Sequence, residues 1–182
     1  MKINVPKTLL LYFLLAISFL NAQDRVSMSI HQDLKLLALG DNLGNMAGTL
    51  NILARAKLQT SQNYIGFCNF MIEYEQANLT KMFSRISGVF GYTINNFGWK
   101  NTPSSEYKRF EVTPAISFGK IKRRRKNTFS WAASIEIGYK IYDRIRISAI
   151  NQYTKRTDLK RKDLRYSFFI GLEYDIAKIT SF

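Results

Sequence analysis

Alternation of apolar and polar residues is the feature of this sequence that most constrains its fold. Over Thr128–Tyr142 every second residue is apolar, and most residues between them are small, polar or charged. The apolar set is Phe129, Trp131, Ala133, Ile135, Ile137, Tyr139 and Ile141. A repeat of two residues is that of a β-strand whose two faces meet different surroundings. The pattern therefore predicts a strand with one apolar and one polar face.

Seven further segments show the same alternation, two of them with noisier faces. They are Val26–His31, Thr49–Leu58, Tyr64–Glu75, Lys81–Ile94, Arg109–Lys120, Arg144–Tyr153 and Arg165–Ile176. Pro114 weakens one of them because proline has no N–H to give to a sheet. Another loses its phase at Ile150 and Asn151. Together the segments predict eight strands.

The length and number of these strands favour a membrane barrel. Several exceed the usual soluble strand of about 5 or 6 residues and match the roughly 9 to 11 residues that cross a bilayer at a tilt. Eight strands form the smallest common closed barrel, whose interior is filled by side chains. We therefore expect an all-β, eight-stranded, antiparallel up-and-down transmembrane barrel without an open pore.

This pattern resembles the small outer-membrane barrels of the OmpA and OmpX type over nearly all of residues 23–182. The resemblance implies a location in the cell outer membrane and assembly by the barrel-assembly machinery. Such barrels commonly finish on an aromatic residue used in assembly, and this sequence finishes at Phe182. A connection at Asn95–Ser105 is longer than the short turns expected on the periplasmic side.

The first residues have the pattern of a secretory signal peptide. Lys2 and Lys7 give a basic start, Thr8–Leu20 is uncharged and apolar, and Ala22 offers a small residue for cleavage. We expect a signal peptide over 1–22 and a barrel domain over 23–182. The apolar run is about 13 residues long, whereas a membrane helix needs roughly 20, so a permanent anchor is the weaker interpretation.

Cys68 is the single cysteine, so no internal disulfide can stabilise the fold.

The net charge of +14 is concentrated in two basic clusters. Strand order places both clusters at one end of the barrel, which faces outward if the N-terminus is periplasmic. Arginine binds phosphate in a bidentate manner, and lipopolysaccharide supplies phosphates at that surface. The predicted contacts are Lys122, Arg123, Arg124, Arg125, Lys126, Lys155, Arg156, Lys160, Arg161 and Lys162. The alternative is that these residues are solvated loops that only keep the protein soluble.

Charged residues also fall on the face of the strands that would point into the barrel. Buried charges need partners, so we expect a network of ion pairs in the lumen. Its predicted members are Arg55, Arg85, Arg109, Glu111, Glu136, Lys140, Arg146 and Glu173. Structural filling is the favoured interpretation of this network, and a gate or ligand site is the alternative.

Other function classes receive little support from the sequence. His31 is the only histidine, and Ser29 would lie about 7 Å away along the same strand face, too far for a nucleophile and its base. No metal, cofactor or nucleic acid is expected, and nothing in the sequence selects an oligomeric state. The favoured function is a non-enzymatic structural or surface-interaction barrel. The alternatives are a soluble periplasmic barrel that binds a small apolar ligand between inward-facing aromatics and, less favoured, an enzyme that modifies lipid A.

Overall fold

The computed structural model describes residues 23–40, 46–60, 65–77, 83–95, 109–123, 126–158 and 164–178. These residues form eight strands and one short helix: β1 (Gln23–Asp33), α2 (Leu34–Leu39), β2 (Asn51–Thr60), β3 (Gly66–Ala77), β4 (Phe83–Ile94), β5 (Phe110–Arg123), β6 (Lys126–Tyr142), β7 (Ile145–Lys155) and β8 (Leu164–Lys178). The expected signal peptide over 1–22 lies outside the described residues. So do Phe182 and the predicted phosphate contacts Arg124, Arg125, Lys160, Arg161 and Lys162.

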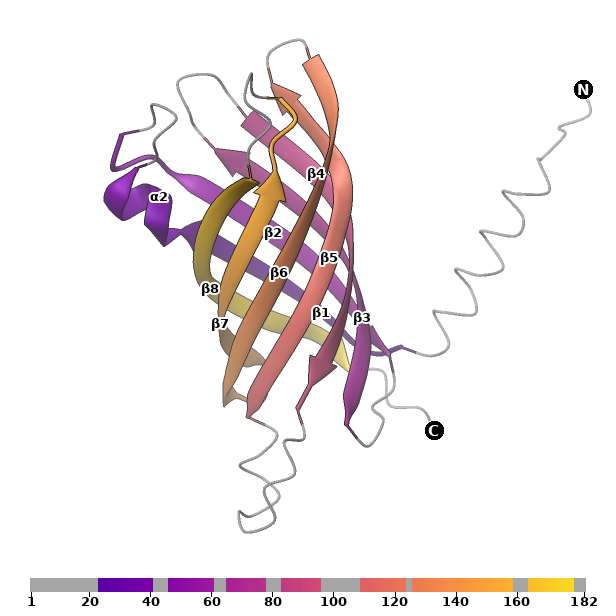
Figure 1. Ribbon diagram of the computed structural model, residues 1–182. Coiled ribbons are helices and arrows are strands. Elements are labelled where there is room, and N and C mark those ends of the chain that lie inside the picture. Colours follow the sequence, from indigo (N-terminus) through magenta and orange to yellow (C-terminus); the bar gives the residue numbers. More distant parts are fainter. Residues whose placement is uncertain are drawn as a thin grey trace, which may run out of the picture.

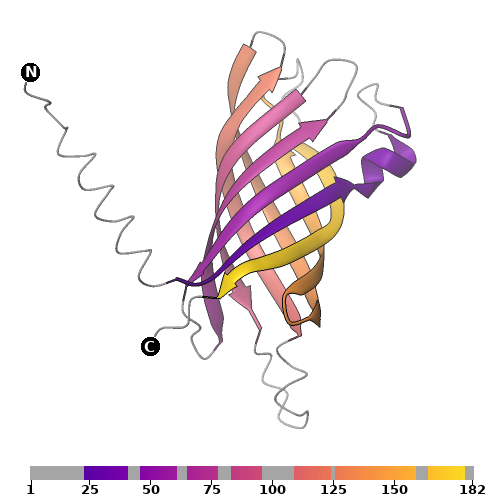
Figure 2. The ribbon, with the colours of Figure 1, turned by 180° about the vertical axis from the view of Figure 1, so that it is seen from behind.

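Each strand pairs in antiparallel fashion with the next one in the sequence, and β1 pairs with β8 to close the barrel (Figure 1). This confirms the predicted eight-stranded antiparallel up-and-down barrel. The start of β1 and the end of β8 lie together at one end, which we call the terminal end (Figure 2). The opposite end, where α2 lies, is the helix end.

The alternation predicted from the sequence holds through the strands, with one correction in β7. Ile150 does not break the phase: it points inward, is fully buried and packs with Leu53 and Phe169. Asn151 accordingly faces outward, where its Oδ1 accepts a 2.7 Å hydrogen bond from the Tyr166 hydroxyl. The loss of phase predicted at these two positions was wrong. The apolar Ile150 belongs to the inner face, and the polar Asn151 forms its hydrogen bond on the outer face.

The apolar rows of the strands form the outer surface of the barrel. Ile30, Ile72 and Phe129 are 66%, 64% and 59% exposed, whereas charged side chains such as Arg85 and Glu173 are buried inside. This is the reverse of a soluble barrel and is the arrangement of a barrel that faces lipid. It is also opposite to the inward-facing aromatics that the carrier of a small apolar ligand requires. No helix in the described part of the chain is long and apolar enough to cross a bilayer.

The helix α2 partly covers the barrel at the helix end. The Asp33 side chain caps its first turn by accepting a 3.1 Å hydrogen bond from the Leu36 N–H. Leu36 is buried against the inward-facing Phe83 and Ile121. Gly40 ends the helix with a φ of 69°, a conformation that glycine adopts without strain. The sequence did not predict this helix.

Candidate functional site

Charged side chains fill the centre of the barrel. Glu136 on β6 lies 2.8 Å from Arg55 Nη1 and 3.1 Å from Lys57 Nζ, both on β2. Arg55 also pairs with Glu73 on β3, and Lys57 lies 2.7 Å from Glu173 on β8. These side chains are at most 6% exposed. Four strands are therefore tied together across the lumen by alternating charges.

The network continues toward the terminal end through Glu173. Its Oε1 accepts a 2.8 Å hydrogen bond from Ser27 and lies 2.6 Å from Arg146 Nη2. Arg146 also pairs with Asp175, and Arg25 lies 3.5 Å from both Asp175 and Glu111. Each of these carboxylates has a cationic partner, which offsets the desolvation cost of burying the charges.

A second set of polar contacts extends toward the helix end. Asp33 lies 3.3 Å from Arg165 Nη2 and accepts a 3.2 Å hydrogen bond from Asn51. The Asn51 amide also donates to Glu75 at 3.0 Å. Arg85 donates to the Ser117 hydroxyl at 2.5 Å. The interior is thus polar along most of the barrel length.

Most residues predicted for the ion-pair network belong to it, and two do not. Arg55, Arg85, Glu111, Glu136, Arg146 and Glu173 all point inward and form ion pairs. Arg109 instead lies exposed before β5, and Lys140 lies 3.1 Å from Asp143 in the turn after β6. Both lie at strand ends. A residue there that alternation assigns to the inner face no longer has the barrel interior beside it.

Arg25 and Asp33 are network members that sequence reasoning missed. Both lie on β1, which was predicted to be a short strand over Val26–His31 and in fact runs from Gln23 to Asp33. A longer strand with the same alternation would have placed both side chains inside.

His31 has an inward-facing partner on another strand. Its Nε2 lies 2.7 Å from the hydroxyl oxygen of Ser148 on β7, rather than near Ser29. His31 and Ser148 are each 1% exposed, so a substrate at the membrane surface does not reach this pair in the described conformation. Gly171 on β8 makes room for the imidazole, since a Cβ there would lie 2.6 Å from His31 Cδ2.

The described residues of the basic cluster around Lys122 point to both faces of a hairpin. The cluster was predicted to be a loop, but β5 continues to Arg123 and β6 begins at Lys126. Because side chains alternate along a strand, Lys120 and Lys122 are exposed on the outer face of β5. Arg123 lies on the other face, 3.4 Å from Asp158. Lys120 and Lys122 therefore face outward, whereas Arg123 does not.

The prediction that Arg156 contacts phosphate was wrong. It is 2% exposed, and its Nε and Nη2 each donate a 2.7 Å hydrogen bond to Asp158. Its guanidinium carbon lies 4.1 Å from the centre of the Phe83 ring. Burial alone would raise the pKa of Asp158, but the bonds and charges of Arg156 and Arg123 outweigh it and hold that pKa below its usual value. Arg156 thus anchors the turn after β7 instead of facing outward.

Four basic residues of the described chain lie toward the helix end. Lys35 lies on α2, exposed Lys120 and Lys122 lie near the end of β5, and half-buried Lys155 lies at the end of β7. We call these four residues the basic rim.

Comparisons with known proteins add little to this picture. No protein-family model and no curated protein matches the chain. Among solved structures it is similar to Neisserial surface protein A, with 10% identity, 84% of this chain and 95% of that chain covered, and a TM-score of 0.48. It is also similar to a barrel from "De novo design of transmembrane beta-barrels", with 14% identity, 85% and 97% coverage and a TM-score of 0.46. The designed protein TMB2.3 shows 16% identity, 86% and 98% coverage and a TM-score of 0.45.

Proposed function

We propose that this chain is an exported, non-enzymatic outer-membrane barrel whose basic rim binds lipopolysaccharide phosphates in the outer leaflet. The observation that carries the proposal is the outer face of β5. Phe110, Ile116 and Phe118 are exposed there, and exposed Lys120 and Lys122 follow directly toward the helix end. An apolar surface that ends in lysines matches the boundary between acyl chains and phosphate headgroups.

The aromatic residues near this boundary support the same placement. Phe118 on β5 and Phe129 on β6 stack with ring centroids 6.4 Å apart. On the opposite side of the barrel, Lys35 lies 5.1 Å above the ring of Tyr166. Aromatic rings and lysine stems are typical of membrane interfaces, where one part of the side chain meets lipid and the other meets headgroups.

The interior supports a structural role rather than catalysis. Most of its acids and bases are paired and buried, which suits filling of the lumen. The enzyme alternative depends on His31 and Ser148, which lie within hydrogen-bonding distance inside the barrel. Its test is the lipid A mass profile of cells that carry the chain or its His31→Ala variant. A product that depends on His31 would favour the enzyme over the proposal.

Binding of lipid A to the purified barrel in detergent tests the proposed function. Lys120→Ser with Lys122→Ser removes two outward charges from the basic rim. Each lysine near an anionic surface contributes about 1 kcal/mol, so we expect a roughly tenfold to thirtyfold loss of affinity at low salt.

The matched control removes the same number of charges from the terminal end. Arg109→Ser with Arg144→Ser changes two exposed residues there, because Arg109 precedes β5 and Arg144 lies in the turn after β6. This variant should bind lipid A as the unmodified protein does. Equal losses in both variants would mean that net charge alone drives binding, and no loss in either would contradict a phosphate site at the rim.

A further inference from the structure

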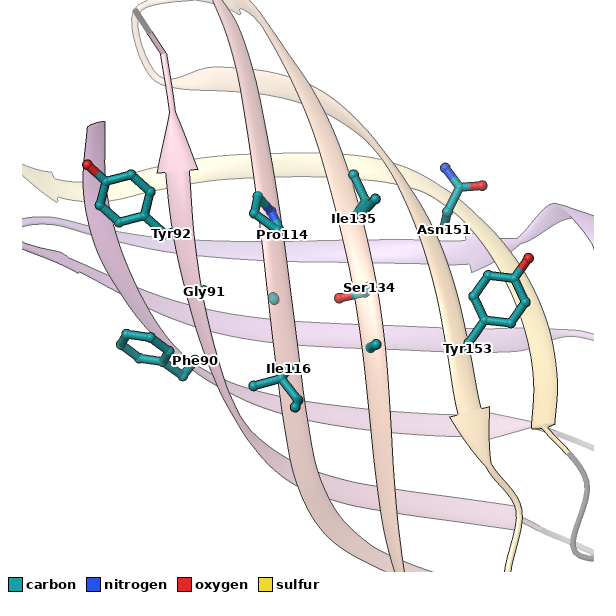
Figure 3. Close-up of a pocket in the computed structure, with 11 residues that line it drawn as sticks. Phe90, Gly91, Tyr92, Pro114, Ile116, Ser134, Ile135, Asn151 and Tyr153 are labelled. Carbon is teal, nitrogen blue, oxygen red and sulfur yellow. The ribbon is translucent and has the colours of Figure 1, made fainter. Parts of the chain in front are cut away.

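The outer face of the barrel is hollowed where β4, β5, β6 and β7 run side by side (Figure 3). The hollow has a volume of about 510 Å³. Phe90 and Tyr92 of β4 stand at one side and Tyr153 of β7 at the other, with Pro114 between them. Ala133 of β6 contributes to the same lining. The lining is almost entirely apolar and faces the region that lipid would occupy.

Two residues of the sequence produce this shape. In one row across the sheet, Phe90 pairs with Ile116, Ile116 with Ala133, and Ala133 with Tyr153, so the smallest side chain lies between larger ones. Pro114 lies beside this row. The pairing of β4 with β5 is interrupted there, whereas the pairing of β5 with β6 continues through Pro114. A missing proline N–H accounts for a local opening of this kind.

The hollow and the lysines Lys120 and Lys122 lie on the same outer face of β5. Lys120 follows Ile116 by four residues on the same face of β5, a distance of about 13 Å along the strand. Gly88 of β4 pairs with Phe118 between them, and no atom lies within 4 Å of the place where its Cβ would be. One leaflet of hydrocarbon is about 15 Å thick, half of the bilayer core. A headgroup at Lys120 therefore has chains long enough to reach the hollow.

We propose that the hollow holds one acyl chain of an anionic lipid whose phosphate lies at Lys120 and Lys122. The inference rests on the proposed function, because it requires the barrel to be in a membrane with its helix end at the headgroups. An unfilled apolar hollow would leave Ala133 and its neighbours without contacts on one side, and a flexible chain restores them. Lys120 and Lys122 attract an anionic phosphate headgroup more strongly than they attract a zwitterionic one.

Quenching of Trp131 fluorescence by brominated acyl chains tests the proposal. Trp131 lies on the outer face of β6, two residues from Ala133, and is 37% exposed. Trp99, the second tryptophan, is replaced by Phe so that Trp131 alone emits. The protein is placed in phosphatidylcholine nanodiscs that contain a small fraction of brominated phosphatidic acid or, separately, of brominated phosphatidylcholine. We expect stronger quenching by the brominated phosphatidic acid.

Filling the hollow should remove this preference without removing the barrel. In Ala133→Phe the ratio of the two quenching strengths should fall to about that of random mixing. The matched control is Ala56→Phe, which adds the same ring to a half-buried outward position on β2, away from the hollow. It should keep the full preference. The mobility of unboiled protein on gels checks that each variant is folded.

The outcomes separate this inference from the proposed function. Loss of preference in Lys120→Ser with Lys122→Ser, but not in Ala133→Phe, would leave the phosphate site standing and overturn the acyl-chain site. No preference in the unmodified protein would overturn the acyl-chain site, whereas the proposed function is overturned by the absence of lipid A binding at the basic rim. A dimer that becomes a monomer in Ala133→Phe by sedimentation would make a second copy of the chain the occupant and would also overturn the acyl-chain site.

Discussion

At the scale of single residues, the barrel depends on small side chains at close approaches and on ion pairs between buried charges. Gly171 lies where β8 passes β1 beside the imidazole of His31. Glu173, two residues further, accepts contacts from Ser27, Lys57 and Arg146. We expect a substitution of Gly171 to cause a steric conflict, and a substitution of Glu173 to remove charge pairing.

Gly171→Ala should destabilise the barrel strongly. An added Cβ would lie 2.0 Å from the Ile30 carbonyl oxygen and 2.6 Å from His31 Cα, both backbone atoms of β1. Backbone cannot move aside as a flexible side chain can, so we expect a loss of about 3 kcal/mol or more in the free energy of unfolding. Urea unfolding of the barrel in lipid vesicles measures it.

Gly88→Ala is the matched control for this prediction. No atom lies within 4 Å of the Cβ position of Gly88, which faces outward on β4. Its free energy of unfolding should stay within about 0.5 kcal/mol of the unmodified protein. Comparable losses in the two glycine variants would contradict the close packing of β8 against β1.

Glu173→Gln should cost about 3 to 5 kcal/mol in the free energy of unfolding. The substitution keeps the shape but removes the negative charge that Lys57 and Arg146 share, and it leaves both cations partly uncompensated in the interior. Asp143→Asn is the control, since Asp143 pairs with Lys140 in an exposed turn. The free energy of unfolding of Asp143→Asn should differ from that of the unmodified protein by too little to measure. A tolerated Glu173→Gln would show that the interior is more hydrated than the contacts indicate.

At the scale of elements, strands β5 and β6 form a hairpin that extends to the basic rim, and the turn after β7 is fastened beside it. Asp158 in that turn accepts two hydrogen bonds from Arg156 and lies 3.4 Å from Arg123 of β5. The Arg156 guanidinium also covers the ring of Phe83 at the start of β4. The paired Arg156 and Asp158 therefore join the β7 turn to β4 and β5.

The contribution of Asp158 to stability should depend on pH. Because folding holds its pKa below the usual value of 3.8, the charged form stabilises the folded state. The stabilisation is fully present above that usual value and is lost as the pH falls through the lower pKa of the folded state. Unfolding of the unmodified protein and of Asp158→Asn, followed from about pH 7 to about pH 3, should show a constant difference that shrinks below about pH 4. A pH-independent difference would refute the ion pair.

The elements show how far the sequence could predict this structure. Period-two alternation located all eight strands, because a barrel in lipid imposes opposite chemistry on its two faces. It did not locate the ends: β1 and β5 both exceed their predicted bounds, since charged residues at strand ends were taken for loops. The short helix α2 was missed because one turn and a half leaves little periodicity to detect.

The candidate sites show the same limit. Parity along strands placed Arg55, Glu136 and Glu173 inside correctly. The pairing of Arg156 with Asp158 and of His31 with Ser148 depends on contacts that are not fixed by alternation alone. The outer hollow was not predicted at all, because it arises from the register that brings Ala133 between Ile116 and Tyr153.

At the scale of the whole molecule, the chain forms a closed barrel with apolar side chains outside and paired charges inside. The closed hydrogen-bonded sheet leaves no free strand edge, which satisfies the backbone within a membrane. The exposed apolar belt and the polar interior both follow from this arrangement. A soluble protein would gain nothing from this distribution of side chains.

Gel mobility of the detergent-extracted outer-membrane fraction, boiled against unboiled, tests this claim most directly. A closed barrel resists the detergent until it is heated, so we expect the protein to be found in this fraction and to migrate differently before and after boiling. Recovery of the protein from the soluble periplasm, with the same mobility before and after boiling, would contradict it.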